Sequence, residues 1–208
     1  MFYNFLNAPL SITPDYLLAV IKYNQLPNRS VIMKPTGMLI DEHHLVGRMI
    51  NIIRLEISKI ENSGKIIDAS VLDSIVDFLR FYINITHHEK EDILLNKLKE
   101  KPIRPEDIEI IEQLIEEHKY MKTAIDDIVN AEMQYFKGEN TLGIIITTFN
   151  ALISLYPKHI QKEEENIFPI VEKYFNDDEL ALMQNEFDRV DREMIHKKYK
   201  TLIEELKK

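Results

Sequence analysis

The sequence has 208 residues, no Cys, and a formal net charge of -9 at pH 7. A chain of this length suits one domain with a sizeable core. The negative charge argues against nucleic acid as a partner, because such binding needs a concentrated basic surface. The lack of Cys excludes disulfides, thiolate-held clusters and cysteine nucleophiles, so any metal must be bound by His, carboxylate, Tyr or water.

The sequence gives no sign of a membrane segment. It contains no apolar run of about 18 residues or more, the length that a transmembrane helix requires. A basic stretch followed by an apolar one, as in a signal peptide, does not occur in the N-terminal residues MFYNFLNAPLSITPDY. The protein is therefore expected to have no membrane partner and to be cytoplasmic.

Residues 1–34 are predicted to be an accessory segment, and residues 35–208 a helical bundle with an additional C-terminal helix. Within the first segment, residues 13–25 favour a short helix, with Thr13 as its cap and Pro14 at the first helical position.

Apolar residues at helical spacing predict four long helices after this segment. The first two are expected over residues 35–60 and 68–99, with Asp68 capping the second. The next two are expected over residues 105–138 and 140–175.

Two prolines and one glycine help to place the second pair of helices. Pro105 stands at the first position of the third helix and Gly138 ends that helix, while Pro157 is expected to kink the fourth. A fifth helix is predicted to run from Asn176 to the C-terminus without a break. Because short loops between long helices make neighbours antiparallel, we predict an all-α, up-down-up-down four-helix bundle.

The bundle contains an internal duplication. The sequence Asp41-Glu42-His43 in the first helix reappears as Glu116-Glu117-His118 in the third, 118 − 43 = 75 residues later. A His-x-x-Lys-Glu pattern in the second helix, with His87 and Glu91, reappears in the fourth, 159 − 87 = 72 residues later. Each half is thus one helix with a single His followed by one with a His and a Glu.

The spacing of these residues predicts a metal site. A His and a Glu four positions apart lie on the same face of a helix, so each pair can reach a common point. Polar groups among core residues are costly unless they pair or bind metal. We therefore predict two metal ions with bridging glutamates, and the predicted ligands are His43, His87, Glu91, His118, His159 and Glu163.

The remaining polar residues near these motifs receive other interpretations. His88, whose rival pairing would be with Asp92, is expected to lie behind the ligands. His44 is predicted to be exposed or behind the ligands, and His196 to lie on the surface. Other side chains are expected to be solvated, or in the case of the lysines to contact the glutamates; these are Lys90, Lys162, Glu164 and Glu165.

Taken together, these motifs over about residues 35–175 resemble the hemerythrin-like, cation-binding family. The resemblance implies a non-haem centre of two iron ions with an oxo or hydroxo bridge, open to a small ligand such as O2, NO or peroxide. It also implies four terminal histidine ligands and two bridging glutamates, at the six positions named above.

The chain departs from family patterns in three places. The oxygen-carrying members have a second His four residues after the one at His118, where this chain has Lys122. They also use a bridging Asp five residues after its His, whereas Glu163 follows by four. Iron-centre repair proteins typically carry an N-terminal Cys segment, which is missing here. Water or Tyr156 could fill the open coordination position, although Tyr156 also suits a place in the core.

Several functions fit this sequence. The first is binding or sensing of O2, NO or peroxide, and an enzymatic reduction of peroxide or NO would use the same site. Iron storage, donation or repair of iron centres is an alternative, and manganese or zinc could take the same ligands. A metal-free interaction module is a further alternative, in which the last helix forms a partner or homodimer face. The sequence does not identify a redox partner.

Overall fold

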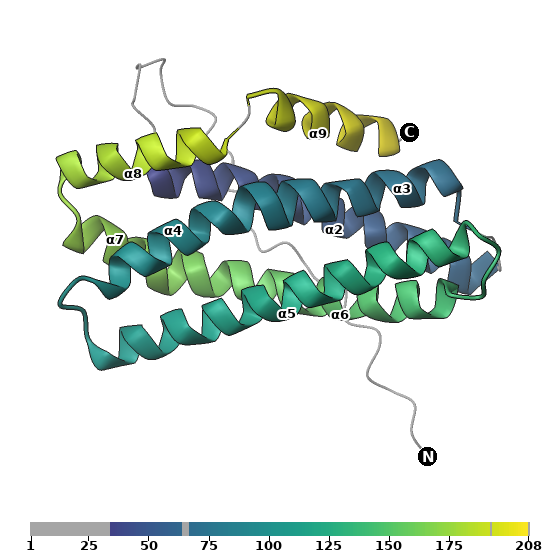
Figure 1. Cartoon of the computed structure of the whole chain (residues 1–208), viewed down its shortest axis with the longest axis horizontal. Coiled ribbons are helices and arrows are strands. Elements are labelled where there is room, and N and C mark those ends of the chain that lie inside the picture. Colours follow the sequence, from purple (N-terminus) through teal and green to yellow (C-terminus); the bar gives the residue numbers. More distant parts are fainter. Residues whose placement is uncertain (1–33, 64–66, 192, 208) are drawn as a thin grey trace, which may run out of the picture. The chain divides into compact units, whose positions relative to one another are not determined.

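The computed structural model of the protein describes residues 34–63, 67–191 and 193–207. Apart from Lys34, the predicted accessory segment and its short helix lie outside these residues. The described residues are helical almost throughout and contain no strand (Figure 1). The prediction of an all-α fold is therefore confirmed for this part of the chain.

The first half of the duplication consists of α2 (Pro35–Ser63) and a long helical run after it. This run is α3 (Ala69–Asp77), a π-helical segment η1 (Phe78–His87) and α4 (His88–Lys99). The Asp68 side chain accepts hydrogen bonds from the backbone N–H groups of Ser70 and Val71, so the predicted cap forms.

The second half consists of α5 (Pro105–Tyr135) and a second interrupted run. This run is α6 (Leu142–Lys162), a π-helical segment η2 (Glu163–Ile167) and α7 (Phe168–Tyr174). Pro105 stands at the start of α5 as predicted, and Gly138 has a positive φ of 90° in the connection that follows. The helix α6 continues through Pro157.

The prediction of one unbroken C-terminal helix is wrong. Two helices are present, α8 (Asp177–Val190) and α9 (Glu193–Leu206). Asp191 between them has extended backbone angles, φ -74° and ψ 135°. Its carboxylate accepts hydrogen bonds from His196 and lies 3.5 Å from Lys90 Nζ, so contacts with distant residues hold this position out of the helix.

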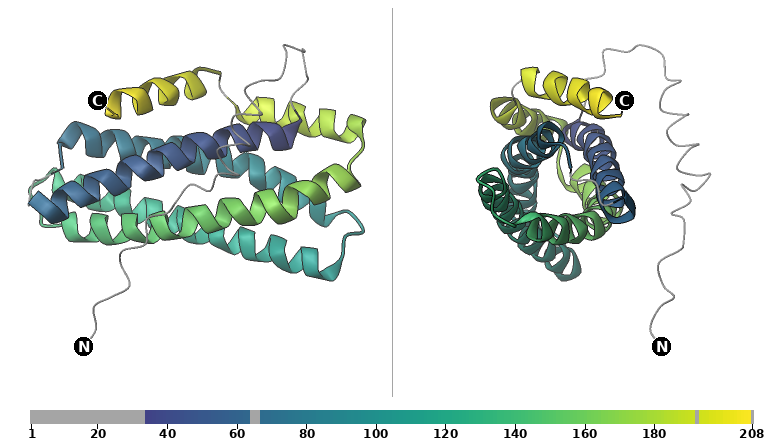
Figure 2. Two further views of the ribbon diagram at one scale, coloured as in Figure 1. Left: turned by 180° about the vertical axis from the view of Figure 1, so that it is seen from behind. Right: turned by 90° about the vertical axis from the view of Figure 1, so that its right-hand side faces the viewer.

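The helices enclose one interior. The helix α5 packs on α6 and on α3 and η1, while α2 packs on α6 and η1 (Figure 2). The helix α8 packs against α4 and α2, and α9 against α2 and η1, on the outside of this arrangement. Met183, Phe187, Tyr199 and Ile203 are buried there, so the C-terminal helices direct an apolar face onto the bundle.

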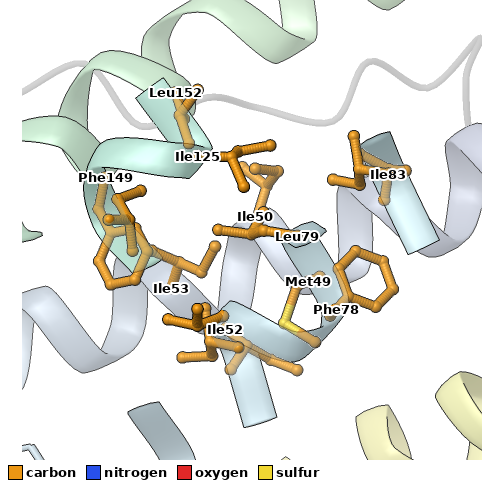
Figure 3. Packing of buried hydrophobic residues seen from close by; sticks show 14 of the residues in the cluster. Met49, Ile50, Ile52, Ile53, Phe78, Leu79, Ile83, Ile125, Phe149 and Leu152 are labelled. Atoms are coloured by element: carbon orange, nitrogen blue, oxygen red, sulfur yellow. The ribbon is translucent and has the colours of Figure 1, made fainter. Parts of the chain in front are cut away.

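Two apolar clusters fill the interior. One includes Met49, Ile53, Leu79 and Ile125 and is drawn in Figure 3. The other lies toward the opposite ends of the same helices and includes Leu39, Leu94, Leu114 and Phe168. The predicted metal ligands occupy the helix positions between these clusters. They form a buried polar layer between two apolar ones.

Candidate metal centre

Glu91 lies between two groups of histidines and directs one oxygen to each. Its Oε1 is 3.0 Å from His43 Nε2 and 3.0 Å from His87 Nε2. Its Oε2 is 3.3 Å from His118 Nε2 on the other side. A carboxylate in this position can bridge two metal ions.

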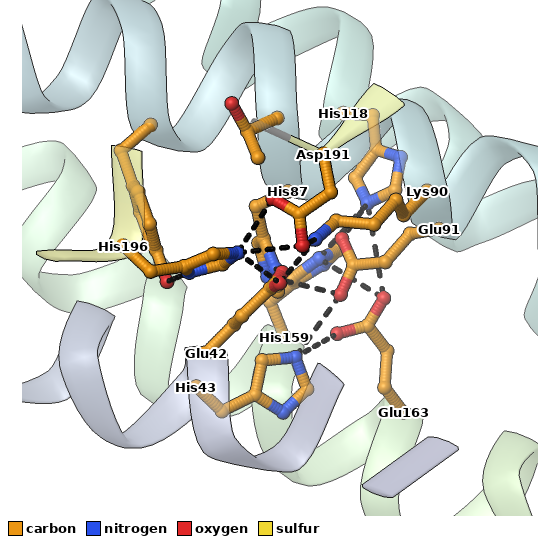
Figure 4. Close-up of polar contacts among 12 residues, drawn as sticks. Glu42, His43, His87, Lys90, Glu91, His118, His159, Glu163, Asp191 and His196 are labelled. Atoms are coloured by element: carbon orange, nitrogen blue, oxygen red, sulfur yellow. Dashed lines mark hydrogen bonds and ion pairs between the residues drawn. The ribbon is translucent and has the colours of Figure 1, made fainter. Parts of the chain in front are cut away.

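Glu163 is arranged in the same way. Its Oε2 is 3.3 Å from His43 Nε2, while its Oε1 is 3.4 Å from His159 Nε2 and 3.8 Å from His118 Nε2 (Figure 4). The two histidine groups are therefore His43 with His87 and His118 with His159. The structure brings all six predicted ligands together, and each is at most 5% exposed.

Each of the four histidines is oriented by a second carboxylate. The Nδ1–H of each ring donates to a carboxylate oxygen at 2.8–2.9 Å, and its Nε2 faces the centre. The acceptors of His43, His87, His118 and His159 are, respectively, Glu164, Glu42, Asp92 and Glu117. Such carboxylate–histidine pairs fix the tautomer and the ring orientation of metal-binding histidines.

The charges of the site call for cations at its centre. Burial alone would lower the pKa of His43, but hydrogen bonds with Glu163, Glu164 and Glu91 outweigh it and raise that pKa well above its ordinary value. Burial likewise opposes protonation of His118, yet its carboxylate neighbours raise its pKa to about 12. Protons on these rings supply the positive charge that the carboxylates require, and metal ions would supply it instead.

Buried atoms without partners point to the same position. His88 Nε2 is buried without a hydrogen-bond partner in the described part of the chain, and the buried oxygens Glu91 Oε2 and Glu163 Oε2 have only histidine nitrogens beside them, at 3.3 Å. Two sets of side chains here have ligand atoms within 4.8 Å of one another and could each hold an ion. One set is His43, His87 and Glu91, and the other is His88, Glu91, His118 and His159. Histidine and carboxylate ligands suit iron, manganese or zinc, so the residues present fit a pair of such ions.

Comparison with known families gives the same assignment. A family profile described as Hemerythrin HHE cation binding domain matches residues 34–171 and also residues 109–208. The chain belongs to this hemerythrin family. The first match spans both halves of the duplication, and the second begins within α5 and runs through the C-terminal helices.

The other two comparisons add no relatives to this hemerythrin domain, since no curated protein and no solved structure matched the chain. Among the described residues, no helix combines the length and the apolar character that crossing a membrane requires.

The lysines of the hemerythrin repeat contact the glutamates that precede His43 and His118. Lys90 is fully buried and donates to Glu42, while Lys162 donates to Glu117 at 2.5 Å. From the sequence, both lysines were expected either to be solvated or to contact the glutamates. The structure instead places each one beside the carboxylate that orients a histidine.

Two further predictions need correction. Glu164 was expected to be solvated, but it accepts the hydrogen bond of His43 and is 36% exposed. His196 was expected on the surface, but its ring bonds to Tyr82 and Asp191 and is 24% exposed. The pairing of His87 with Glu91 was preferred to the rival pairing of His88 with Asp92, and Asp92 accepts from His118. His44 was expected to be exposed or to lie behind the ligands, and it is exposed.

His88 was predicted to lie behind the ligands, and the structure places it beside them. The residue is 4% exposed, and its ring stacks on that of His118 with 4.4 Å between centroids. Tyr156 is also buried, 6.2 Å from the His88 ring and 6.5 Å from the His159 ring. Both residues border the centre of the hemerythrin domain.

A third set of possible ion ligands lies next to the centre and consists of Glu42, Asp191 and His196. Lys90 contacts both carboxylates of this group, so a cation is already present there. The lysine offsets part of the negative charge of Glu42 and Asp191, whereas Glu91 and Glu163 have no lysine contact among the described residues.

Proposed function

We propose that this protein holds two iron ions, joined by an oxo or hydroxo bridge, in an up-down-up-down four-helix bundle and binds or senses O2, NO or peroxide there. The ligands would be the six residues predicted from the sequence, with Glu91 and Glu163 as the bridges. The observation that carries the proposal is that each glutamate directs one oxygen to each histidine group. When bound, iron supplies a change of redox state and a position for a small ligand.

The surrounding residues preorganise the site. Apolar clusters lie on both sides of it, and the four carboxylates behind the histidines hold the Nε2 atoms toward the centre. Imidazole ligands oriented in this way lose little freedom when an ion binds.

Tyr156 has the character of a hydrogen-bond donor in this site. Burial, together with the nearby charges of Glu91 and Glu163, raises its pKa well above the ordinary value. The phenol therefore stays protonated, and its hydroxyl has no hydrogen-bond partner among the described residues. In the metal-free site it is suited to donate a hydrogen bond to a small molecule.

A cavity lies beside two of the histidines. It has a volume of about 460 Å³ and is lined by His88 and His118 together with Asn84, Asn96 and Lys122. It is the side from which we propose that a small polar molecule such as peroxide approaches the centre. With a net charge of -9, the protein is proposed to act without nucleic acid, and its cytoplasmic location remains part of this proposal.

The first experiment measures metal content and the absorption spectrum of protein purified aerobically from iron-supplied cells. We expect two irons per chain and oxo-to-iron charge-transfer bands that change when NO, peroxide or O2 is added. Protein that binds fewer than two irons, or whose bands respond to none of these molecules, would contradict the proposal.

A further inference from the structure

Two His-His doublets stand at the centre, one on each helix of the first half. His43-His44 lies in α2, and His87-His88 lies where η1 passes into α4. Neighbouring residues of a regular α-helix point about 100° apart, so only one of each doublet should face the interior. His44 follows this rule and is exposed, but His88 is buried beside its neighbour.

The π-helical segment explains the difference between the doublets. The backbone N–H of His88 donates to the carbonyl of Ile83, five residues earlier, instead of four as in an α-helix. This wider turn changes the direction of the side chains that follow it. Such π-helical turns inside α-helices are frequent at functional sites. Here the turn brings two consecutive imidazoles into the same interior.

The surroundings of His88 are those of a ligand. One ligand atom each from His88, Glu91, His118 and His159 lie within 4.8 Å of one another. The His88 ring is stacked on His118 and lies 6.1 Å from the His159 ring. Its Nε2 is buried without a hydrogen-bond partner in the described part of the chain. Buried polar atoms are rarely left unpaired, which calls for an explanation of this one.

Packing alone does not account for a histidine here. The duplicated position in the second half, 88 + 72 = 160, is the apolar residue Ile160, which packs against the core. A buried imidazole with no partner is less favourable than such a side chain, because its polar nitrogen is removed from water without compensation.

We propose that His88 is a seventh protein ligand, completing a set of three histidines with His118 and His159 on one of the two metal ions. This inference rests on the proposed function and deepens it. The other ion has two histidines, His43 and His87, so the two ions differ in their number of protein ligands. The ion bound by His88 is also the one that the solvent cavity reaches, since His88 and His118 line that cavity.

The test compares His88→Ala and His88→Gln with His44→Ala as the matched control. Cobalt(II) is titrated into the metal-free proteins without oxygen, and ion stoichiometry and the cobalt d–d bands are recorded, which gain intensity as the number of ligands falls. We expect wild-type protein and His44→Ala to bind two ions alike. In both His88 variants, affinity for one ion should fall by more than the roughly 10–100-fold that losing an orienting partner costs.

Thermal unfolding separates a ligand from a packing residue. His88→Gln should change the Tm of the metal-free protein little, whereas His88→Ala leaves a cavity that costs stability with and without metal; in both variants the loss of Tm should be larger when metal is present. Equal losses of Tm with and without metal, or two ions bound with wild-type affinity and bands in both His88 variants, would overturn the inference alone. A wild-type protein that fails to bind two ions would overturn the proposed function with it.

Discussion

The two halves of the bundle surround the centre with the same residue types but expose them differently to water. In the first half, the side chains of Glu42 and Lys90 are 3% and 0% exposed. In the second half, their counterparts Glu117 and Lys162 are 24% and 26% exposed. The duplicated motif thus orients a histidine in both halves, but only in the first half is its ion pair removed from water.

The C-terminal helices cause this difference. The helices α8 and α9 cover the first half, where Asp191 lies 3.5 Å from Lys90 and His196 Nε2 lies 3.6 Å from Glu42. The described residues of the second half have no such cover. The same local motif therefore orients a histidine in both halves, but its Glu–Lys pair is expected to affect stability differently in each.

The largest loss of metal binding is expected for the two glutamates that contact both histidine groups. Glu91→Ala and Glu163→Ala should each abolish binding of both ions, since each carboxylate serves both histidine groups. The loaded protein should then lose the stabilisation that metal gives, about 4 kcal/mol at a free ion concentration of roughly 1,000 Kd. Metal analysis and unfolding with and without iron measure this, with exposed Glu165→Ala as the control. Two ions retained in either variant would refute the bridging assignment.

The second comparison sets Glu42→Ala against Glu117→Ala in metal-free protein. Removing Glu42 leaves the buried Lys90 without its nearest carboxylate, and breaking a buried pair costs about 3–5 kcal/mol. Removing Glu117 should cost less, about 1–3 kcal/mol, because Lys162 can turn to water and the main loss is the acceptor of the buried His159 Nδ1–H. Denaturant unfolding gives both values.

Metal affinity supplies the matched readout for these two variants. Each one removes the acceptor of a histidine Nδ1–H, so both should weaken ion binding by about 10–100-fold. Equal losses of stability in the two variants would show that the cover of the first half has no energetic consequence.

A smaller effect is expected for His196→Ala, which has no counterpart in the second half. The variant loses the hydrogen bonds of the ring to Tyr82 and Asp191, with a cost of about 1 kcal/mol. The exposed neighbour variant Lys197→Ala should be neutral. Denaturant unfolding that gave both variants the same stability would argue that α9 is held by its apolar residues alone.

The smallest effect concerns Glu132, a buried carboxyl of α5 whose Oε1 makes no hydrogen bond among the described residues. Burial, with the charges of Asp73 and Asp77, raises its pKa from 4.5 to about 7. The pKa of Glu132 is higher in the folded state than in the unfolded state. Its contribution to the free energy of unfolding is therefore fully present below pH 4.5 and is lost as the pH rises through 7.

Glu132→Gln should therefore raise the Tm by about 2 °C near pH 8 and leave it almost unchanged near pH 5. Thermal unfolding of wild type and variant at both pH values tests this. A gain that is the same at the two pH values would mean that the charge of Glu132 is not its cause.

Much of the fold was predictable because local chemistry decides it. The cap at Asp68 and the start at Pro105 depend on residues within one helical turn. The break at Asp191 was not predictable, since its partners Lys90 and His196 come from other elements. Helical periodicity continues across this position, and only tertiary contacts interrupt it.

For the site, spacing was sufficient to predict which six side chains converge. The same reasoning set His88 behind the ligands, because only His87 keeps the repeat in register with His159. The π-helical turn before His88 has no recognisable signal in the sequence. The burial of Lys90 depends on α8 and α9, which the sequence did not place over the first half.

The contact between α9 and Glu42 gives the C-terminus an influence on the centre. Glu42 accepts the hydrogen bond of His87, and His196 of α9 lies beside the same carboxylate. Any change in the charge on His87 would therefore also change the interaction between Glu42 and His196. By reciprocity, a molecule that displaced α9 would shift the affinity of the centre by the same free energy with which the centre resists that displacement.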